Sequence, residues 1–329
     1  MAKIHHTVPL EDRLNFYLNF PRESEQVNIS SEVYQGSRRM YKEHKAVFQY
    51  EKYKSSFLEW YCLNLIHKNP FNKIRSLPGY RQYSNLLTLS DFLKLFQFSS
   101  GKIRNKNFLL YHGEQVLSEN LPYIRKARKI KDKHSVLFKL GTIRHFFPCK
   151  TAMKHDIEWK RKKENVIWRG ATTNEKFRST FVKKYFDLFD VGFSSVVQRP
   201  YLSLYRKDTV SIRKQLTHKY IVSLEGCDLA SNLKWILSSN SVPVMPKPTW
   251  VSWIMEHKLV PYVHYLPLND ELDNLEELLD WAKANDDACA EIALNGKRYM
   301  MQFWNEKKEN QIQQQLLSRY TNLFKLLAG

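Results

Sequence analysis

Cationic and polar side chains follow short apolar stretches of this sequence, and their chemistry suits the phosphates of a nucleotide. Arg169 follows the apolar residues of 165–168, and Arg178 lies a few positions further on. Ser231, Asn232 and Lys234 follow the apolar run that ends at Leu224. Guanidinium and ammonium groups neutralise phosphate charge, and the backbone amides at the start of a helix add to this effect. These residues predict an anion site.

The chain has only 10 glycines, and none has the spacing of a glycine-rich phosphate loop. A bound diphosphate is therefore expected to be held by side chains and helix N-termini. For Arg169 the alternative is a surface arginine in a salt bridge, and for Ser231 and Asn232 it is ordinary N-capping, which is compatible with ligand contact.

The elements that position these residues alternate between strands and helices, which predicts an α/β fold with a parallel sheet. In such sheets ligands bind beyond the carboxyl ends of the strands, so Arg169 is expected to point into that crevice. A further strand at 108–113 places Glu114 at a similar strand end. The predicted strands lie at 165–170, 218–224, 242–245 and 263–266, and the predicted helices at 175–189, 232–238, 273–284, 286–301 and 306–327.

Length and charge point to two domains and a phosphate-bearing partner. The 329 residues are 43% hydrophobic and 14% aromatic, enough for two buried cores. Residues 1–165 carry 31 Lys and Arg against 15 Asp and Glu, whereas residues 166–329 carry 21 against 18. The basic first half can attract nucleic acid, anionic lipid headgroups or a phosphorylated glycolipid, or can be a solvated surface.

Cysteine spacing and hydropathy limit the cell compartment. The four cysteines form no Cys-x-x-Cys or Cys/His pattern, so reduced thiols are expected rather than disulfides or a structural zinc. The longest uncharged apolar stretch, 235–246, is shorter than the ~20 residues of a membrane span. The first residues lack the apolar core of a secretory signal. We expect a cytoplasmic protein.

Four sequence blocks between Val166 and Ala288, taken together in their order and spacing, resemble glycosyltransferase family 90. Further blocks at 111–116, 125–130 and 135–146 resemble its bacterial branch, the lipopolysaccharide-core transferases, so the resemblance spans roughly residues 108–300. The four blocks are Val166-Ile-Trp-Arg-Gly-Ala171 with Arg178 downstream, Glu225-Gly-Cys-Asp-Leu-Ala-Ser-Asn-Leu-Lys-Trp235, Leu259-Val-Pro-Tyr-Val-His-Tyr-Leu-Pro-Leu268 and Trp281-Ala-Lys-Ala-Asn-Asp-Asp-Ala288.

This resemblance implies a GT-B architecture, in which two Rossmann-like domains face a central cleft. It assigns residues 1–150 to an acceptor-side domain with a basic surface and 151–305 to a domain that binds the donor nucleotide-sugar. Residues 306–329 form a C-terminal helix that packs back across the domains. The resemblance implies no metal and no cofactor beyond the co-substrate, a nucleotide-sugar that is expected to be UDP-linked.

The resemblance also implies site residues. The family's aspartate base corresponds in position to Glu114, with Asp132 and Asp156 as reserve candidates. Lys234 stands near the position where animal members have an arginine. The donor-binding residues carried over are Arg169, Gly170, Arg178, Ser231, Asn232 and Lys234.

The expected function is inverting transfer of a hexose to a lipopolysaccharide or lipooligosaccharide core. The basic half is then expected to attach the protein peripherally to the anionic inner leaflet of the inner membrane, where the phosphorylated glycolipid acceptor is displayed. A transferase acting on protein or capsule polysaccharide is the closer alternative. A basic nucleic-acid-binding protein is the alternative from another class, since it explains the charge of +19.

Overall fold

A computed structural model describes residues 7–19, 27–29, 45–49, 91, 95, 107–111 and 121–326. The backbone divides into two compact units, which we treat separately. Unit 1 comprises residues 1–7 and 143–304, and unit 2 comprises residues 8–142 and 305–329. The C-terminal helix therefore belongs to unit 2, together with residues 8–142. The short helix α7 (Thr142–His145) lies at the boundary.

Unit 1 contains alternating strands and helices, as the sequence pattern predicts. Its elements in chain order are α8 (Phe147–His155), η2 (Trp159–Arg161), β7 (Lys163–Ala171), α9 (Glu175–Tyr185), β8 (Asp190–Ser195), η3 (Pro200–Tyr205), α10 (Ile212–Gln215), β9 (His218–Val222), α11 (Leu233–Leu237), β10 (Val242–Met245), β11 (Trp250–Ser252), η4 (Glu256–Lys258), β12 (Leu266–Pro267), α12 (Leu275–Ala284) and α13 (Asp286–Met301).

Five of these strands form one parallel sheet in the order β12-β10-β9-β7-β8. The chain runs from β7 outward to β8, then returns to the other side of β7 and continues through β9, β10 and β12. Residue partners such as Ile167 with Ile221 and Gly170 with Phe193 fix the register around β7. The direction of winding thus reverses between β7 and β9.

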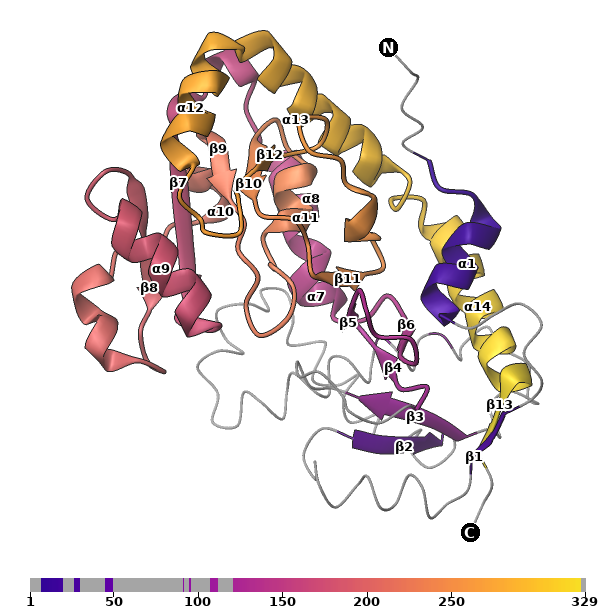
Figure 1. Ribbon diagram of the computed structural model, residues 1–329. Coiled ribbons are helices and arrows are strands. Elements are labelled where there is room, and N and C mark those ends of the chain that lie inside the picture. Colours follow the sequence, from indigo (N-terminus) through magenta and orange to yellow (C-terminus); the bar gives the residue numbers. More distant parts are fainter. Residues whose placement is uncertain are drawn as a thin grey trace. The chain divides into compact units, whose positions relative to one another are not determined.

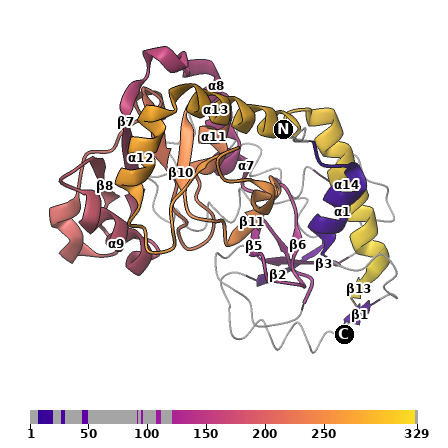
Figure 2. The same ribbon diagram turned by 45° about the horizontal axis from the view of Figure 1, so that its top comes forward.

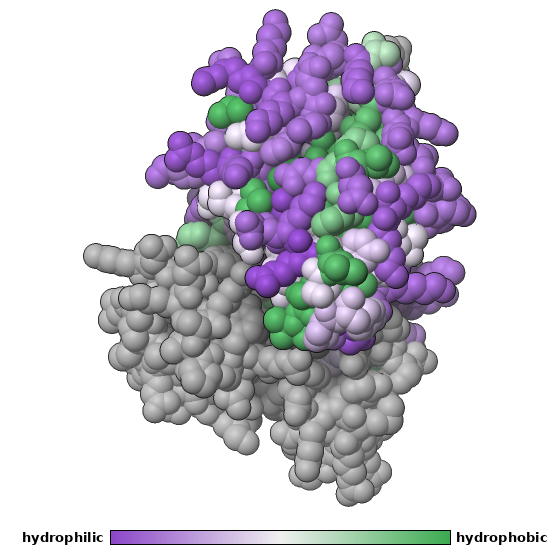
Figure 3. All heavy atoms as spheres, turned by 90° about the vertical axis from the view of Figure 1, so that its left-hand side faces the viewer, coloured by the Kyte–Doolittle hydropathy of each residue, from purple (hydrophilic) through white to green (hydrophobic). Residues whose placement is uncertain are grey.

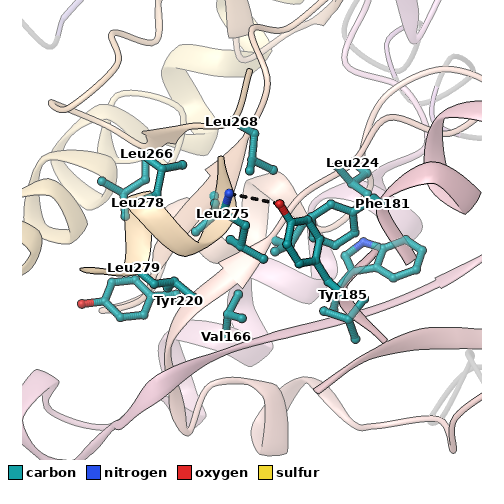
Figure 4. Packing of buried hydrophobic residues seen from close by; sticks show 14 of the residues in the cluster. Val166, Phe181, Tyr185, Tyr220, Leu224, Leu266, Leu268, Leu275, Leu278 and Leu279 are labelled. Atoms are coloured by element: carbon teal, nitrogen blue, oxygen red, sulfur yellow. Dashed lines mark hydrogen bonds between the residues drawn. The ribbon is translucent and has the colours of Figure 1, made fainter. Parts of the chain in front are cut away.

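The core of unit 1 lies on one face of this sheet. Alternate residues of the strands, such as Val166 and Trp168, pack against α9, α12 and α13. In Figure 4 the hydroxyl of Tyr185 lies within this cluster and accepts a hydrogen bond of 3.2 Å from the backbone amide of Leu275, which joins α9 to the start of α12. Alternation at a period of two is what a pleated strand requires to direct one set of side chains to one face.

The other face is covered as well, which explains why every residue of β9 is buried. Helix α11 contacts β10 and also packs against α8. In Figures 1 and 2 the strands lie between α12 on one side and α8 and α11 on the other. Unit 1 is therefore a three-layer α/β domain.

The described residues of unit 2 include a small mixed sheet and the helices α1 and α14. The sheet has the order β2-β3-β4-β6, with β2 antiparallel to β3 and the other pairs parallel. Helix α1 packs against α14, where Arg13 pairs with Glu309 at 2.7 Å in a buried ion pair. The elements are α1 (Leu10–Leu18), β1 (Val27–Ile29), β2 (Lys45–Gln49), β3 (Asn107–Tyr111), β4 (Ile124–Arg125), β5 (Ala127–Lys129), β6 (Val136–Leu137), α14 (Glu306–Leu323) and β13 (Phe324–Leu326).

The predicted α/β class is confirmed, and most predicted elements of unit 1 lie within a few residues of the observed ones. The prediction of a strand at 263–266 is wrong, because the strand β12 begins only at Leu266. Tyr262 has a φ of 58°, and the Nδ1 atom of His264 accepts a hydrogen bond of 3.0 Å from the amide of Val260. These features make a compact turn in which His264 has a structural role.

A charged network joins the amino end of the sheet to the start of α13. The ammonium of Lys219 lies 2.7 Å from Asp286 and 2.8 Å from Glu164, and the indole of Trp159 donates to Asp286 at 3.1 Å. Burial alone would raise the pKa of Asp286, but the hydrogen bonds from Lys219 and Trp159 outweigh it and hold that pKa below its ordinary value. The network therefore stabilises the fold when Asp286 is ionised.

Replacement of Asp286 by asparagine should lower stability in a pH-dependent way. Because the folded pKa lies below the unfolded one, the contribution is present above about pH 4 and is lost as the pH falls through the folded pKa. The difference in melting temperature between the wild type and Asp286→Asn should be largest near pH 7 and shrink below about pH 4. A difference that grew on acidification would contradict this role, and the exposed Asp280→Asn serves as the matched control.

Candidate active site

The carboxyl edge of the parallel sheet is the candidate site, because the winding reverses there between β7 and β9. Loops that follow two neighbouring strands diverge at such a point and leave room for a ligand. Here the loop 172–174 leads from β7 into α9, and the loop 223–232 leads from β9 into α11. Both loops belong to unit 1.

Arg178 of α9 joins these two loops. Its guanidinium donates to the carbonyl of Ala171 at 3.0 Å and to the hydroxyl of Thr173 at 2.7 Å, both on the β7 side. On the β9 side it donates to the carbonyls of Leu224 at 2.7 Å and Glu225 at 3.1 Å. These four acceptors are uncharged, and together they hold the guanidinium of Arg178 at the carboxyl edge of the sheet.

The start of α9 contributes a second source of positive potential at the same edge. Asn174 precedes the helix in the left-handed region, with φ 51°, and its side chain makes no capping hydrogen bond. The first amides of an α-helix have no intrahelical acceptor, and the helix dipole adds a partial positive charge there. A helix of 11 residues that begins at the switch point is suited to bind a phosphate.

Glu225 fixes the loop that follows β9 at this edge. Its carboxylate accepts hydrogen bonds from the amide of Thr249 at 2.8 Å and the amide of Trp250 at 2.9 Å, and also from the Thr249 hydroxyl. The loop after β9 is thereby tied to the segment that leads into β11. Sequence reasoning missed this role of Glu225 and that of Thr173. The available signal was their position in the loops that follow two predicted strands.

Arg169 lies elsewhere on the sheet. Its guanidinium pairs with the carboxylate of Asp190 at 2.6 Å and donates to the carbonyls of Asp190 and Asp208. Asp190 begins β8, so the guanidinium points back along the strands and not beyond their carboxyl ends, where we expected it. These contacts agree with the alternative that Arg169 forms a salt bridge, and the candidate site does not depend on Arg169.

Gly170 is explained by packing. A Cβ atom added to Gly170 would lie 2.4 Å from Cζ2 of Trp168, whose indole is buried in the core. A glycine at this position lets the indole lie flat against the strand. Its donor contact remains a prediction from the family resemblance.

Replacement of Gly170 by alanine should destabilise unit 1 by about 1–3 kcal/mol, the usual cost of overpacking a core. Denaturant unfolding measures this loss. The double variant Gly170→Ala/Trp168→Phe should recover part of it, since the smaller ring makes room for the methyl group, so the two substitutions should be non-additive. An alanine variant as stable as the wild type would show that the indole shifts without cost.

Ser231 and Asn232 lie in the loop after β9, on the β9 side of the switch point. The Asn232 side chain does not cap α11; its amide donates to the carbonyl of Val222 at 2.8 Å and accepts from the Ser223 hydroxyl at 3.0 Å. It therefore ties the loop back to the end of β9. Ser231 is half-buried in the turn before it.

Lys234 is fully buried. Its ammonium lies 3.1 Å from the carboxylate of Glu256 in η4 and over the ring of Trp253. The same carboxylate accepts from the amide of Ser252 at 2.6 Å and from its hydroxyl at 2.7 Å. We expected Lys234 to face the leaving diphosphate, but its side chain points into the interior of unit 1, and α11 is a helix of only 5 residues.

Of the three candidate bases, one lies outside the described residues, and the other two are held by hydrogen bonds or an ion pair within the fold. Glu114 lies outside the described residues. Asp132 accepts from the hydroxyl of Ser135 and from the amides of Ser135 and His134. Burial alone would raise the pKa of Asp132, but these bonds hold it below the ordinary value, which makes Asp132 a weaker base. Asp156 is engaged by Lys162 at 2.6 Å.

No helix among the residues that the structure describes is both long and apolar enough to cross a bilayer. No group of three or more His, Cys, Asp and Glu side chains among them is arranged to hold a metal ion.

Comparison with known proteins identifies the fold's family. The family model described as glycosyl transferase family 90 matches residues 143–328. The chain belongs to glycosyltransferase family 90. This confirms the resemblance in the sequence. The matched range contains the whole parallel sheet, Arg178 and both loops of the switch point.

Two of the curated proteins to which the chain is similar are named O-glucosyltransferases. The chain is 33% identical over 208 residues to "O-glucosyltransferase LpsA" of Dichelobacter nodosus, a match that covers 62% of this chain and 63% of that protein. It is 26% identical over 152 residues to "Protein O-glucosyltransferase 1" of Homo sapiens, with 43% and 38% covered. The matches thus span less than two thirds of these relatives' lengths.

Proposed function

We propose that this family 90 chain transfers a hexose from a nucleotide-sugar, a UDP-sugar, to the core of a lipopolysaccharide or lipooligosaccharide. The observation that carries the proposal is Arg178, whose guanidinium joins the two loops at the switch point of the parallel sheet. Glucose is the first sugar to test, since the relatives are named O-glucosyltransferases.

The carboxyl edge is suited to hold the diphosphate of the donor. The amides that begin α9 can donate to phosphate oxygens, and the guanidinium of Arg178 lies 2.7 Å from the Thr173 hydroxyl in the loop that leads into this helix. As the bond between the anomeric carbon and the diphosphate breaks, negative charge grows on the leaving oxygen. A fixed positive potential at that position stabilises the transition state more than the ground state.

The acceptor hydroxyl supplies the electrons for the new bond. We assign Glu114 to take its proton while the oxygen attacks the anomeric carbon from the side opposite the diphosphate, which inverts the configuration. A GT-B arrangement of two Rossmann-like lobes, without an obligatory metal, is part of this proposal. It is supported by the family membership and by the three-layer α/β fold of unit 1.

The acceptor is proposed from the bacterial relative and from the charge. The name LpsA and 31 Lys and Arg against 15 Asp and Glu in residues 1–165 favour an anionic glycolipid on the inner leaflet. We therefore place the protein peripherally on the inner membrane. A protein acceptor is the second candidate, because the animal relatives are named protein O-glucosyltransferases.

A donor screen followed by product analysis tests the proposal. Purified protein is mixed with a panel of UDP-, GDP- and dTDP-sugars, and the melting temperature identifies the donor that binds. Transfer is then measured by mass spectrometry with delipidated core oligosaccharide, and NMR gives the anomeric configuration of the product. UDP-glucose should stabilise the protein and yield a core extended by one hexose. Binding of RNA without any nucleotide-sugar binding would overturn the proposal.

The base assignment is tested separately. Glu114→Gln should lower turnover by about 100-fold or more while donor binding remains, because only the proton acceptor is lost. Asp132→Asn serves as the matched control, since that carboxylate is held by its own turn. Full turnover of Glu114→Gln would remove Glu114 from the mechanism and leave the donor site standing.

A further inference from the structure

The segment after β8 exposes apolar side chains to an unusual degree. Val197 is 85% exposed, Leu204 is 82% exposed and Tyr201 is 63% exposed. Val197 and Leu204 are the two most exposed large apolar side chains among the described residues. We call residues 196–207 the β8 loop.

The β8 loop is anchored, so this exposure is built into the fold. Leu202, in the middle of η3, is only 2% exposed and belongs to the core of unit 1. The ring of Tyr205 packs edge-on against Phe186 at 5.5 Å between centroids. The amide of Lys207 donates to the carbonyl of Phe193 at 2.9 Å, which closes the loop back onto β8. Its buried anchors thus hold the exposed side chains outward.

The β8 loop lies at the same edge of the sheet as the candidate donor site. β8 pairs with β7 up to Ala171 and Ser195, so the loop leaves the sheet at the carboxyl ends of the strands. The guanidinium of Arg199 forms an ion pair with Glu175, the first residue of α9. The loop therefore flanks the start of α9 on the β8 side.

The part of unit 1 that contains the β8 loop is rich in cations. Residues 171–216 contain nine Lys and Arg against four Asp and Glu, whereas residues 217–329 contain 11 against 14. The exposed cations of this part include Lys176 and Lys183 of α9 and Arg206 of the loop itself. Figure 3 views the side that carries α9 and β8 and shows apolar surface interrupted by hydrophilic side chains. Exposed aliphatic and aromatic groups within a basic surface are typical of proteins that dip into an anionic lipid interface.

We propose that the β8 loop is a membrane-contact surface, which inserts Val197, Tyr201 and Leu204 into the headgroup region of an anionic bilayer. The cations of residues 171–216 attract the anionic headgroups, and the apolar side chains leave water when the loop inserts. This contact turns the carboxyl edge of the sheet toward the lipid surface. The inference deepens the proposed function, because a lipid-borne acceptor is presented at that surface, but vesicle binding tests it without turnover.

Vesicle co-sedimentation compares two charge-neutral triple variants of the full chain. Val197→Ser/Tyr201→Ser/Leu204→Ser removes the apolar tips, and Leu188→Ser/Leu294→Ser/Met301→Ser removes exposed apolar groups elsewhere in unit 1. With vesicles of phosphatidylcholine containing about 30% phosphatidylglycerol, the first triple should lower the partition coefficient by about tenfold and the control by less than about twofold. Equal binding by the two triples would overturn the proposal. So would a loss of self-association in the first triple with unchanged vesicle binding, which identifies a second copy as the occupant.

Fluorescence quenching tests contact directly. Leu204→Trp is compared with Leu294→Trp, each against the background of the eight native tryptophans. Vesicles with brominated acyl chains should quench the additional emission of Leu204→Trp and not that of Leu294→Trp. Absence of extra quenching for Leu204→Trp would contradict insertion. If both vesicle experiments succeed and no sugar is transferred to any acceptor, the proposed function fails and the membrane contact stands.

Discussion

Replacing Arg178 by glutamine should abolish donor binding while leaving the parallel sheet folded. The guanidinium makes hydrogen bonds to both loops of the switch point, and glutamine cannot reach all four acceptors or supply the charge. We expect kcat/KM to fall by about 100-fold or more, as when a group that stabilises developing charge is removed. Calorimetric titration with UDP and steady-state transfer to core oligosaccharide measure the two effects.

Two further variants separate the charge of Arg178 from its geometry. Arg178→Lys keeps the charge but presents a single nitrogen, so it should recover less than about a tenth of the lost activity. Arg298→Gln, which removes an exposed arginine paired with Glu291 on α13, is the control and should bind the donor normally. If Arg178→Gln bound UDP within about threefold of the wild type, the switch point would not be the diphosphate site.

The sequence predicted the layout of unit 1 because its strands are buried on both faces. Runs such as Val242–Met245 are continuously apolar, which is typical of central parallel strands, and the predicted limits of that strand match the observed ones. Residues 263–266 are also mostly apolar and were predicted to form a strand for the same reason. The φ of 58° at Tyr262 and the hydrogen bond that His264 accepts from Val260 turn that segment instead, and backbone conformation of this kind leaves no periodic signal.

For the candidate site, the sequence predicted the order of strands, loops and helices better than the direction in which individual side chains point. As predicted, Arg178 lies in the helix that follows β7, and the loop 223–232 follows β9. The sequence could not show that Arg169 reaches back to Asp190, or that Lys234 turns inward to a carboxylate 22 residues later in the chain. Long flexible side chains can bridge in several directions, so strand order alone does not fix where their charge lies. The proposed base Glu114 stays a prediction.

Replacing Lys234 by methionine should strongly lower the stability of unit 1 and leave donor binding almost unchanged. The ammonium and the Glu256 carboxylate are both almost completely buried, at 1% and 2% exposure of their side chains. Loss of the cation leaves a buried carboxylate without its counter-charge, and breaking one partner of such a pair costs about 3–5 kcal/mol. Denaturant unfolding at pH 7 should show this loss, whereas UDP affinity below the unfolding transition should stay within about threefold of the wild type.

The double variant Lys234→Met/Glu256→Gln decides whether the loss comes from the unpaired charge. Glutamine retains one oxygen that can accept from the amide of Ser252, its side-chain NH2 group can donate to the Ser252 hydroxyl oxygen, and it needs no cation. We therefore expect the double variant to recover at least half of the stability that Lys234→Met loses, because an apolar and neutral pair of similar volume can replace a buried ion pair at little cost. Additive destabilisation would show that the methylene packing of Lys234 matters more than its charge. A stable Lys234→Met protein that no longer bound UDP would instead return Lys234 to the donor site, where the family resemblance placed it.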